Sequence, residues 1–349
     1  MLNRRTFLAS SLMVGGVSAV GPVLAAAAGD ADVLIWDNHS GFGFAGPDDI
    51  KLLDKWRTAG VHYLSLNVFG FDGLPWDSAV RAIADYTRAI ETRSDIVLCA
   101  TVAQVQAARR AGKMAVTFDI EGMRALNGDL AMVETYYRLG VRQMLIAYNL
   151  NNDAGGGCHD DDRGLTDFGR AVIVEMNRVG MVVDCAHSGI KSGLEAMRLS
   201  TKPCVFSHAN ARALRDHERN ITDEQIKAVA ATGGVVGVNG LSSYLDRGPA
   251  KLDALVRHID YMAKLVGVDH VGIGLDFDPS NNAPLDDPGA AKYWPERQYP
   301  RDVKADFLSP SIFPALPGAL RAAGYKDNAI RAIMGGNFLR VASQVWATR

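Results

Sequence analysis

Short apolar runs rich in β-branched residues alternate with segments of helical periodicity along most of the chain. We interpret eight runs as strands, because several are apolar nearly throughout, as strands buried on both faces are. They cover residues 33–37, 61–67, 114–119, 141–147, 181–185, 203–207, 234–238 and 270–275. Between them, apolar positions at helical spacing predict helices over 77–93, 101–111, 167–179, 190–198, 223–231 and 251–266.

Eight strands alternating with helices in a chain of this length predict a (β/α)8 TIM-like barrel. The alternative is a doubly wound open sheet, which a glycine-rich phosphate loop after the first strand would favour. The sequence at that point is NHSGFGF, residues 38–44, and it lacks the GxGxxG spacing, so we prefer the barrel. Residues 276–312 are rich in Pro, Asp and Asn and predict a long loop that caps the mouth of the barrel.

Residues 1–28 have a basic start, an apolar run and an alanine-rich end, which is the pattern of a signal peptide. The pair Arg4-Arg5 resembles a twin-arginine signal. We therefore expect export to the periplasm, with residues 29–349 forming a single domain. The alternative is a membrane anchor, but the glycines and Pro22 weaken a helix that must stay in lipid. We expect no stable membrane insertion after the signal is cleaved.

The charge balance excludes one class of partner. The chain has 37 Lys and Arg against 39 Asp and Glu. Without Arg4 and Arg5 the basic residues number 35, so the net charge is −4. No basic stripe is present, and we therefore expect no nucleic-acid partner.

The four cysteines show no CxxC spacing. Cys185 and Cys204 lie in apolar runs, which indicates buried thiols. An oxidising compartment would permit a disulfide between Cys99 and Cys158, and the sequence leaves that pairing open.

Polar side chains of several chemistries gather where the predicted strands end. In a barrel all these strand ends converge on one face. The residues concerned are Asp37, His39, Asp119, Glu121, Tyr148, Asn149, Asp184, His187, Ser207, His208, Asp276 and Asp278. A single histidine at a strand end is more often structural. The prediction of a shared site therefore depends on such residues occurring at the ends of six strands. Imidazole and carboxylate together suit Zn²⁺ or a similar divalent ion, and a metal pair can activate water for hydrolysis.

Six motifs in order along the chain resemble the renal (membrane) dipeptidase family of zinc peptidases. They are DIEG, GLTDFGRAVIVEMNRVGMVVDCAHSG, PCVFSHANARAL, RNITDEQI, VGIGLDFD and GGNFLRV. The similarity is densest from about Gly164 to Asp278. It implies a (β/α)8 barrel that hydrolyses dipeptides with a metal-activated water, including dipeptides with a D-residue at the C-terminal side.

The resemblance also assigns metal ligands. It implies that His39 binds a first metal, that Glu121 bridges two metals, and that His187 and His208 bind the second. Three residues with an open position for water are the usual set of a catalytic zinc site.

The first metal motif departs from the family pattern. The family usually has His-x-Asp after the first strand, whereas this chain has Gly41 at the last position. Asp37 and His39 would face the same way on a strand. We expect Asp37 to orient His39 rather than to replace the missing ligand. The first metal would then have only His39, Glu121 and water, which predicts one tight Zn²⁺ and a second, weaker one.

The resemblance implies roles for three further residues. Arg219 would bind the substrate carboxylate, for which the planar guanidinium fork is suited. Asp276 would accept the proton of the bridging water. Tyr148 stands where related enzymes often carry a histidine that binds the developing oxyanion, and a tyrosine hydroxyl can donate the same hydrogen bond.

Two other functions remain open at this stage. One is a metal-dependent hydrolase or tailoring enzyme of the same fold that acts on a non-dipeptide amide or ester, which the changes at Gly41 and Tyr148 motivate. The other is a non-catalytic protein that captures peptide carboxylates through Arg219. The sequence leaves open the side-chain preference of the substrate and whether the protein forms a homodimer.

Overall fold

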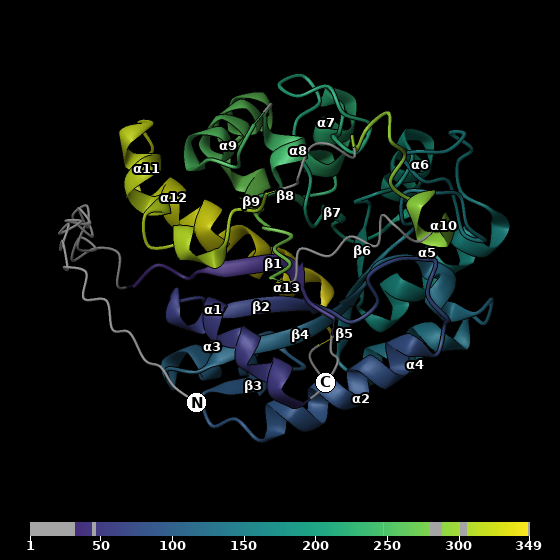
Figure 1. Ribbon diagram of the computed structural model, residues 1–349, viewed down its shortest axis with the longest axis horizontal. Helices are drawn as coiled ribbons and strands as arrows, with labels where there is room; N and C mark the ends of the chain where they lie inside the picture. Colours follow the sequence, from purple (N-terminus) through teal and green to yellow (C-terminus); the bar gives the residue numbers. More distant parts are fainter. Residues whose placement is uncertain (1–31, 44–46, 247, 280–287, 301–305, 348–349) are drawn as a thin grey trace, which may run out of the picture.

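The computed structural model describes residues 32–43, 47–246, 248–279, 288–300 and 306–347. Its sheet is parallel in every pairing, and eight strands follow one another in the order β1-β2-β4-β5-β6-β7-β8-β9. Their bounds are Trp36–Gly41, Tyr63–Asn67, Met114–Ile120, Val141–Leu145, Val182–Asp184, Val205–Phe206, Val235–Val238 and Val271–Ile273. Figure 1 shows the helices arranged around these strands, which confirms the predicted (β/α)8 barrel.

The first and last strands, β1 and β9, meet at the C-terminal mouth of the barrel. The backbone N–H of Asp276 donates to the carbonyl oxygen of His39 at 2.8 Å. The N–H of Gly41 donates to the carbonyl oxygen of Phe277 at 3.3 Å. The residues that close the barrel at this edge are therefore neighbours of the predicted metal motif.

All eight predicted strands are present, with two differences from the prediction. The strand expected to end at residue 37 continues to Gly41, because Ser40 and Gly41 pair with β2 beyond a bulge. A ninth strand, β3 (Ile96–Leu98), lies outside the barrel order and pairs with β4. Three residues are too few to show a period, so the pattern did not reveal it.

The six predicted helices are confirmed. They are α2 (Ser78–Glu91), α3 (Val102–Arg110), α5 (Asp167–Val179), α6 (Ile190–Leu199), α7 (Asp223–Ala231) and α9 (Leu252–Val266). The helix α5 ends at Gly180, whose φ of +90° is a left-handed conformation that favours glycine. Further helices are α1 (Asp54–Thr58), α4 (Ala131–Arg138), α8 (Ser242–Leu245), α10 (Pro288–Ala291), α11 (Leu316–Ala322), α12 (Asp327–Arg331) and α13 (Asn337–Val345).

Across the described part of the chain, no helix is both long and apolar enough to cross a membrane. The predicted signal, residues 1–28, lies outside the described residues.

An apolar cluster fills the N-terminal end of the barrel. Inward-facing Trp36 and Tyr63 stack there with ring centroids 3.5 Å apart, and Trp346 packs beside both rings. Phe338 and Val341 of α13 belong to the same buried cluster. These side chains close the end of the barrel that lies opposite the mouth where His39 and Asp276 meet.

All four cysteines are free thiols. Cys185 and Cys204 are buried, as predicted. The structure contains no disulfide between Cys99, which is buried, and Cys158, which is half-buried.

Candidate active site

His39 lies on β1 and is held from β4. Its Nδ1 is 3.1 Å from Oδ1 of Asp119. Asp119 is fixed in turn by Ser65, whose hydroxyl donates to Oδ2 at 2.6 Å, and by Asn67, whose Nδ2 donates to Oδ1 at 3.0 Å. This arrangement leaves Nε2 of His39 directed at Glu121, with 3.5 Å between Nε2 and Oε1.

The expectation that Asp37 orients His39 is wrong. A β-bulge between Asp37 and Ser40 shifts the register of β1 against β2 and breaks the two-residue alternation of the side chains. Asp37 instead accepts hydrogen bonds from Trp56 Nε1 at 2.9 Å, from Ser40 Oγ at 2.7 Å and from the N–H of Leu275 at 2.9 Å. It therefore anchors β1 to α1 and to the chain after β9.

The structure brings the four predicted metal ligands together. Nε2 of His187, after β6, lies 3.2 Å from Oε1 of Glu121, and Nε2 of His208, after β7, lies 3.3 Å from the same oxygen. The two Nε2 atoms are 2.9 Å apart. Zinc–ligand bonds of about 2.0–2.2 Å place ligand atoms about 3.3–3.6 Å apart at the corners of a tetrahedron. The two spacings from Oε1 of Glu121 are close to that range, whereas the two Nε2 atoms lie nearer to each other than such a geometry requires.

Hydrogen bonds fix the proton of His187 on the nitrogen that faces away from this centre. Asn149 Nδ2 donates to the carbonyl oxygen of Tyr293 at 2.8 Å, which identifies Oδ1 as the free acceptor of the amide. Oδ1 of Asn149 lies 2.6 Å from Nδ1 of His187. Nδ1 must therefore carry the hydrogen, and Nε2 presents a lone pair.

His208 is also held on the side that faces away from this centre, because its Nδ1 lies 2.7 Å from Oγ of Ser207. Nε2 of His187, Nε2 of His208 and the buried Oε1 of Glu121, which has no hydrogen-bond partner, face one another. A cation is the group that satisfies all three.

The pKa shifts are consistent with a donor set for a cation. Burial, together with the charges of nearby Arg219 and His39, lowers the pKa of His187 and His208 well below 6.5 and keeps both imidazoles neutral. Burial raises the pKa of Glu121 well above its usual value. Burial would lower the pKa of His39, but the carboxylates of Asp119 and Glu121 outweigh it and raise the pKa to about 10. The carboxylates of Asp119 and Glu121 thus favour a positive charge beside them. Together with the neutral imidazoles of His187 and His208, they fit a divalent ion.

Backbone strain is concentrated in the site. Among the described residues, four non-glycine residues have positive φ, and three of them are Asn149 (59°), His187 (60°) and Asp276 (57°). Such a conformation costs roughly 1–3 kcal/mol and persists where the surrounding structure enforces it. This strained backbone directs three polar side chains into the site.

Arg219 is a buried cation that lacks a carboxylate partner. It is 2% exposed, and no ion pair joins it to any described acidic residue. Its guanidinium donates to the carbonyl oxygen of His208 at 2.7 Å and lies 5.7 Å from the ring centre of Tyr244, while Nε has no hydrogen-bond partner. A buried guanidinium with free donors suits an anionic ligand.

Tyr148 covers one side of the histidines. Its ring stacks on His187 with centroids 4.1 Å apart. Burial raises the pKa of Tyr148 well above 10, and the charges of Glu121 and Asp276 raise it further, so its hydroxyl remains a donor. Phe71, Tyr293 and Trp294 pack around the ring, the latter two from the predicted loop over 276–312. The described part of that loop therefore covers the mouth, as predicted.

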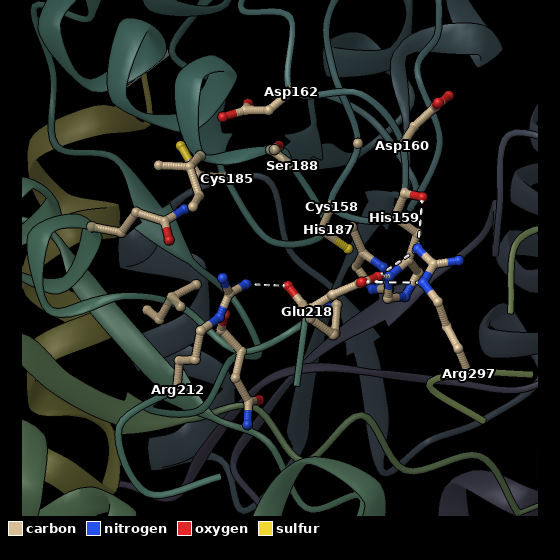
Figure 2. A pocket seen from close by; sticks show the side chains of 17 residues that line it. Cys158, His159, Asp160, Asp162, Cys185, His187, Ser188, Arg212, Glu218 and Arg297 are labelled. Atoms are coloured by element: carbon tan, nitrogen blue, oxygen red, sulfur yellow. Dashed lines mark hydrogen bonds and ion pairs between the residues drawn. The ribbon is translucent and has the colours of Figure 1, made fainter. Parts of the chain in front are cut away.

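A cavity of about 170 Å³ adjoins His187 and Arg219. Figure 2 shows Glu218 between Arg212 and Arg297 in this cavity. The Glu218 carboxylate accepts two hydrogen bonds from Arg297, at 3.2 and 2.8 Å, and its Oε2 lies 2.8 Å from Nδ1 of His159. The charge of Glu218 is thus neutralised by partners other than Arg219. The cavity gives a small ligand room beside Arg219.

Two contributors to the site were not recognised in the sequence. Asn239 follows β8 and donates from Nδ2 to Oδ2 of Asp276 at 2.9 Å; its position after a strand was the available signal. Asp72, from the loop after β2, accepts from the N–H of Tyr148 at 3.1 Å. Its carboxylate fills the space that a Cβ at Gly122 would need, so glycine follows Glu121 there. No local pattern marks Asp72.

The sequence of this chain matches known proteins over most of its length. Residues 75–293 match the family model of the membrane dipeptidases, peptidase family M19. An uncharacterized protein in the pqqA 5′ region of Klebsiella pneumoniae is 32% identical over 262 residues, which span 71% of this chain and 89% of that protein. The uncharacterized dipeptidase C965.12 of Schizosaccharomyces pombe is 35% identical over 199 residues, 54% of this chain. That match spans only 47% of the yeast protein.

The fold has a close counterpart among solved structures. An amidohydrolase from Pseudomonas aeruginosa superposes with a TM-score of 0.83 at 28% sequence identity, over 91% of this chain and 98% of the other. The matched family region includes Glu121, His187, His208, Arg219 and Asp276. The chain belongs to the membrane dipeptidase family, peptidase family M19.

Proposed function

We propose that the protein is a zinc-dependent dipeptidase that hydrolyses the peptide bond of free dipeptides. One observation carries the proposal: three inward-facing histidines and Glu121 converge beside Arg219, a buried cation that forms no ion pair with any carboxylate of the described residues. The first group fits a divalent ion, and the second fits the terminal carboxylate of a small peptide. Family membership supports the same activity.

A divalent ion held by Glu121, His187 and His208 would lower the pKa of a water molecule and polarise the substrate carbonyl. The side chains of the protein perform the other steps. Arg219 binds the terminal carboxylate and fixes the substrate beside the ligands. Asp276, whose side chain is 25% exposed at the mouth, accepts the proton of the attacking water. The Tyr148 hydroxyl donates to the carbonyl oxygen as it gains charge.

The decisive experiment is elemental analysis of protein purified without added metal, coupled to a hydrolysis screen. The screen contains L,L-, L,D- and Gly-containing dipeptides together with lactones and acylated amines. We expect bound zinc and cleavage of dipeptides. Cleavage of a different amide or ester alone would indicate another hydrolase of this fold, and a protein that binds peptides without metal would be a non-catalytic relative.

The role of Tyr148 can be separated from metal binding. In Tyr148→Phe the ring still stacks on His187, but the donor to the oxyanion is lost. We expect kcat to fall by about 10²–10³, the usual effect of removing one such donor, with zinc content and KM nearly unchanged. Steady-state kinetics and elemental analysis measure both. An unchanged kcat would exclude the hydroxyl from catalysis.

We also propose that the protein is exported to the periplasm by the twin-arginine pathway, on the basis of residues 1–28. Changing Arg4 and Arg5 together to Lys keeps the charge but removes the twin-arginine pair. We expect uncleaved precursor to accumulate in the cytoplasm, as shown by cell fractionation and immunoblotting. Normal periplasmic accumulation of this variant would disprove the proposed route.

A further inference from the structure

The metal position next to His39 lacks a side-chain donor at residue 41. Gly41 supplies none, and a Cβ built there would lie 2.9 Å from Cβ of Asn67. Asn67 is committed to holding Asp119, so it has little freedom to move. Any ligand that completes this position must come from another strand.

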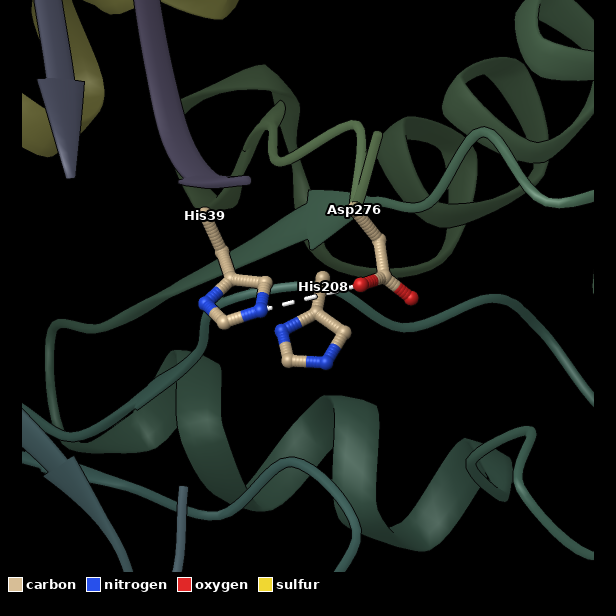
Figure 3. Close-up of side chains that lie close together, drawn as sticks. All are labelled: His39, His208 and Asp276. Carbon is tan, nitrogen blue, oxygen red and sulfur yellow. Dashed lines mark ion pairs between the residues drawn. The ribbon is translucent and has the colours of Figure 1, made fainter. Parts of the chain in front are cut away.

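Asp276 is the carboxylate that reaches the metal position next to His39. Oδ1 of Asp276 lies 3.6 Å from Nε2 of His39, and Oε1 of Glu121 lies 3.5 Å from the same nitrogen. Figure 3 shows the Asp276 carboxylate facing the ring of His39, with His208 beside them. Donor atoms of His39, His208 and Asp276 all lie within 4.8 Å of one another. Both spacings from Nε2 agree with those of atoms that share one tetrahedral ion.

The backbone fixes the direction of the Asp276 side chain. Its N–H is bound to the carbonyl oxygen of His39 at 2.8 Å, and its φ of 57° is a strained conformation. The next residue is tied to β1 as well, because the N–H of Phe277 donates to Oγ of Ser40 at 3.1 Å. Asn239 occupies Oδ2 from the other side, so Oδ1 is the oxygen left for an ion.

We propose that Asp276 is a metal ligand in this protein, and that it holds a second divalent ion together with His39 and Glu121. This inference rests on the proposed function and deepens it. Gly41 of β1 offers no carboxylate, and Asp276, which follows β9, supplies one instead. One nitrogen and two carboxylate oxygens with an open coordination position are a suitable donor set for zinc or a similar divalent ion. A carboxylate that binds through Oδ1 can still accept a proton at its other oxygen.

The test is a zinc titration of metal-free protein by calorimetry, with cobalt absorption as a second readout. Wild type should bind two ions, and Asp276→Asn should bind only the ion of Glu121, His187 and His208. We expect affinity for the other ion to fall by more than about 100-fold, since loss of a group that merely orients a ligand already costs about 10–100-fold. Asparagine tolerates the positive φ, so this variant keeps the backbone.

Two controls make the result specific. Asp278→Asn removes a carboxylate two residues further on, which belongs to no group of converging donors among the described residues, and it should bind both ions. Tyr148→Phe should lose activity but also bind both ions. Circular dichroism melts verify that each variant is folded, and Asp276→Ala should repeat the loss seen with Asp276→Asn.

A wild type that binds a single ion, or an Asp276→Asn variant that binds both ions with unchanged affinity, overturns the inference. In either case the dipeptidase proposal survives if wild type binds zinc and cleaves dipeptides. Wild type that binds no divalent ion or cleaves no dipeptide would instead overturn the proposed function itself.

Discussion

His187→Ala and His208→Ala are each expected to abolish dipeptide hydrolysis and to release the more tightly bound ion. Each removes one of three donors, and two protein ligands are fewer than a zinc site normally has. The remaining Glu121 oxygen and single imidazole would be left buried and incompletely paired. Elemental analysis after dialysis and steady-state kinetics on a cleavable dipeptide measure the two losses.

A histidine outside the site gives the matched control. His270, whose Nδ1 is bound to the carbonyl oxygen of Gly234, directly precedes β9 at the end of the strand opposite the mouth. His270→Ala should keep both zinc and rate. Asn149→Ala, which removes the acceptor of the His187 proton together with the hydrogen bond to Tyr293, should weaken zinc binding by about 10–100-fold. Full metal content and rate in both ligand variants would show that these histidines are not ligands.

Arg219→Lys is expected to reduce kcat/KM for free dipeptides by about 30-fold or more. Lysine keeps the charge but cannot form the two parallel hydrogen bonds of a guanidinium with a carboxylate. Truncating one partner of a buried charged pair costs about 2–5 kcal/mol, and 2 kcal/mol corresponds to a factor of about 30. C-terminally amidated dipeptides should be poor substrates of wild type and should respond little to the substitution.

The comparison with Arg212→Lys tests whether the effect belongs to Arg219. Arg212 lines the same cavity, but its guanidinium donates to the carbonyl oxygens of Glu218 and Asn220. We expect Arg212→Lys to change kcat/KM much less. Because Arg219 also binds the carbonyl oxygen of His208, zinc content is measured in parallel. Equal efficiency of wild type on free and amidated dipeptides would rule out carboxylate recognition.

The fold and the ligand residues could be predicted because both depend on repeated local patterns. Eight apolar runs gave the barrel, and the barrel alone places the polar strand ends on one face. Glu121, His187 and His208 stand at such ends, so their meeting follows from topology without knowledge of any contact.

The partners of the ligands could not be predicted in the same way. The bulge in β1 breaks the alternation that would have placed Asp37 and His39 on the same side, and no residue in the sequence specifies that register shift. His39 is therefore held by Asp119 from another strand. Likewise Asn149 binds a histidine 38 positions away, and the direction of that amide depends on a third segment, at Tyr293. Such contacts depend on packing between strands and loops rather than on local periodicity.

The hydrogen bonds that close the barrel between β1 and the chain after β9 couple ion binding to the stability of the whole domain. Ser40 and Phe277, which help to join these ends, are 237 positions apart. An ion shared by His39 and Asp276 can recognise only a chain whose first and last strands have already met. A ligand specific for the native state stabilises it by about 4 kcal/mol at a thousandfold excess over its dissociation constant. The ion would thus stabilise the closed barrel as a whole. Its loss would favour global unfolding rather than local opening of one loop.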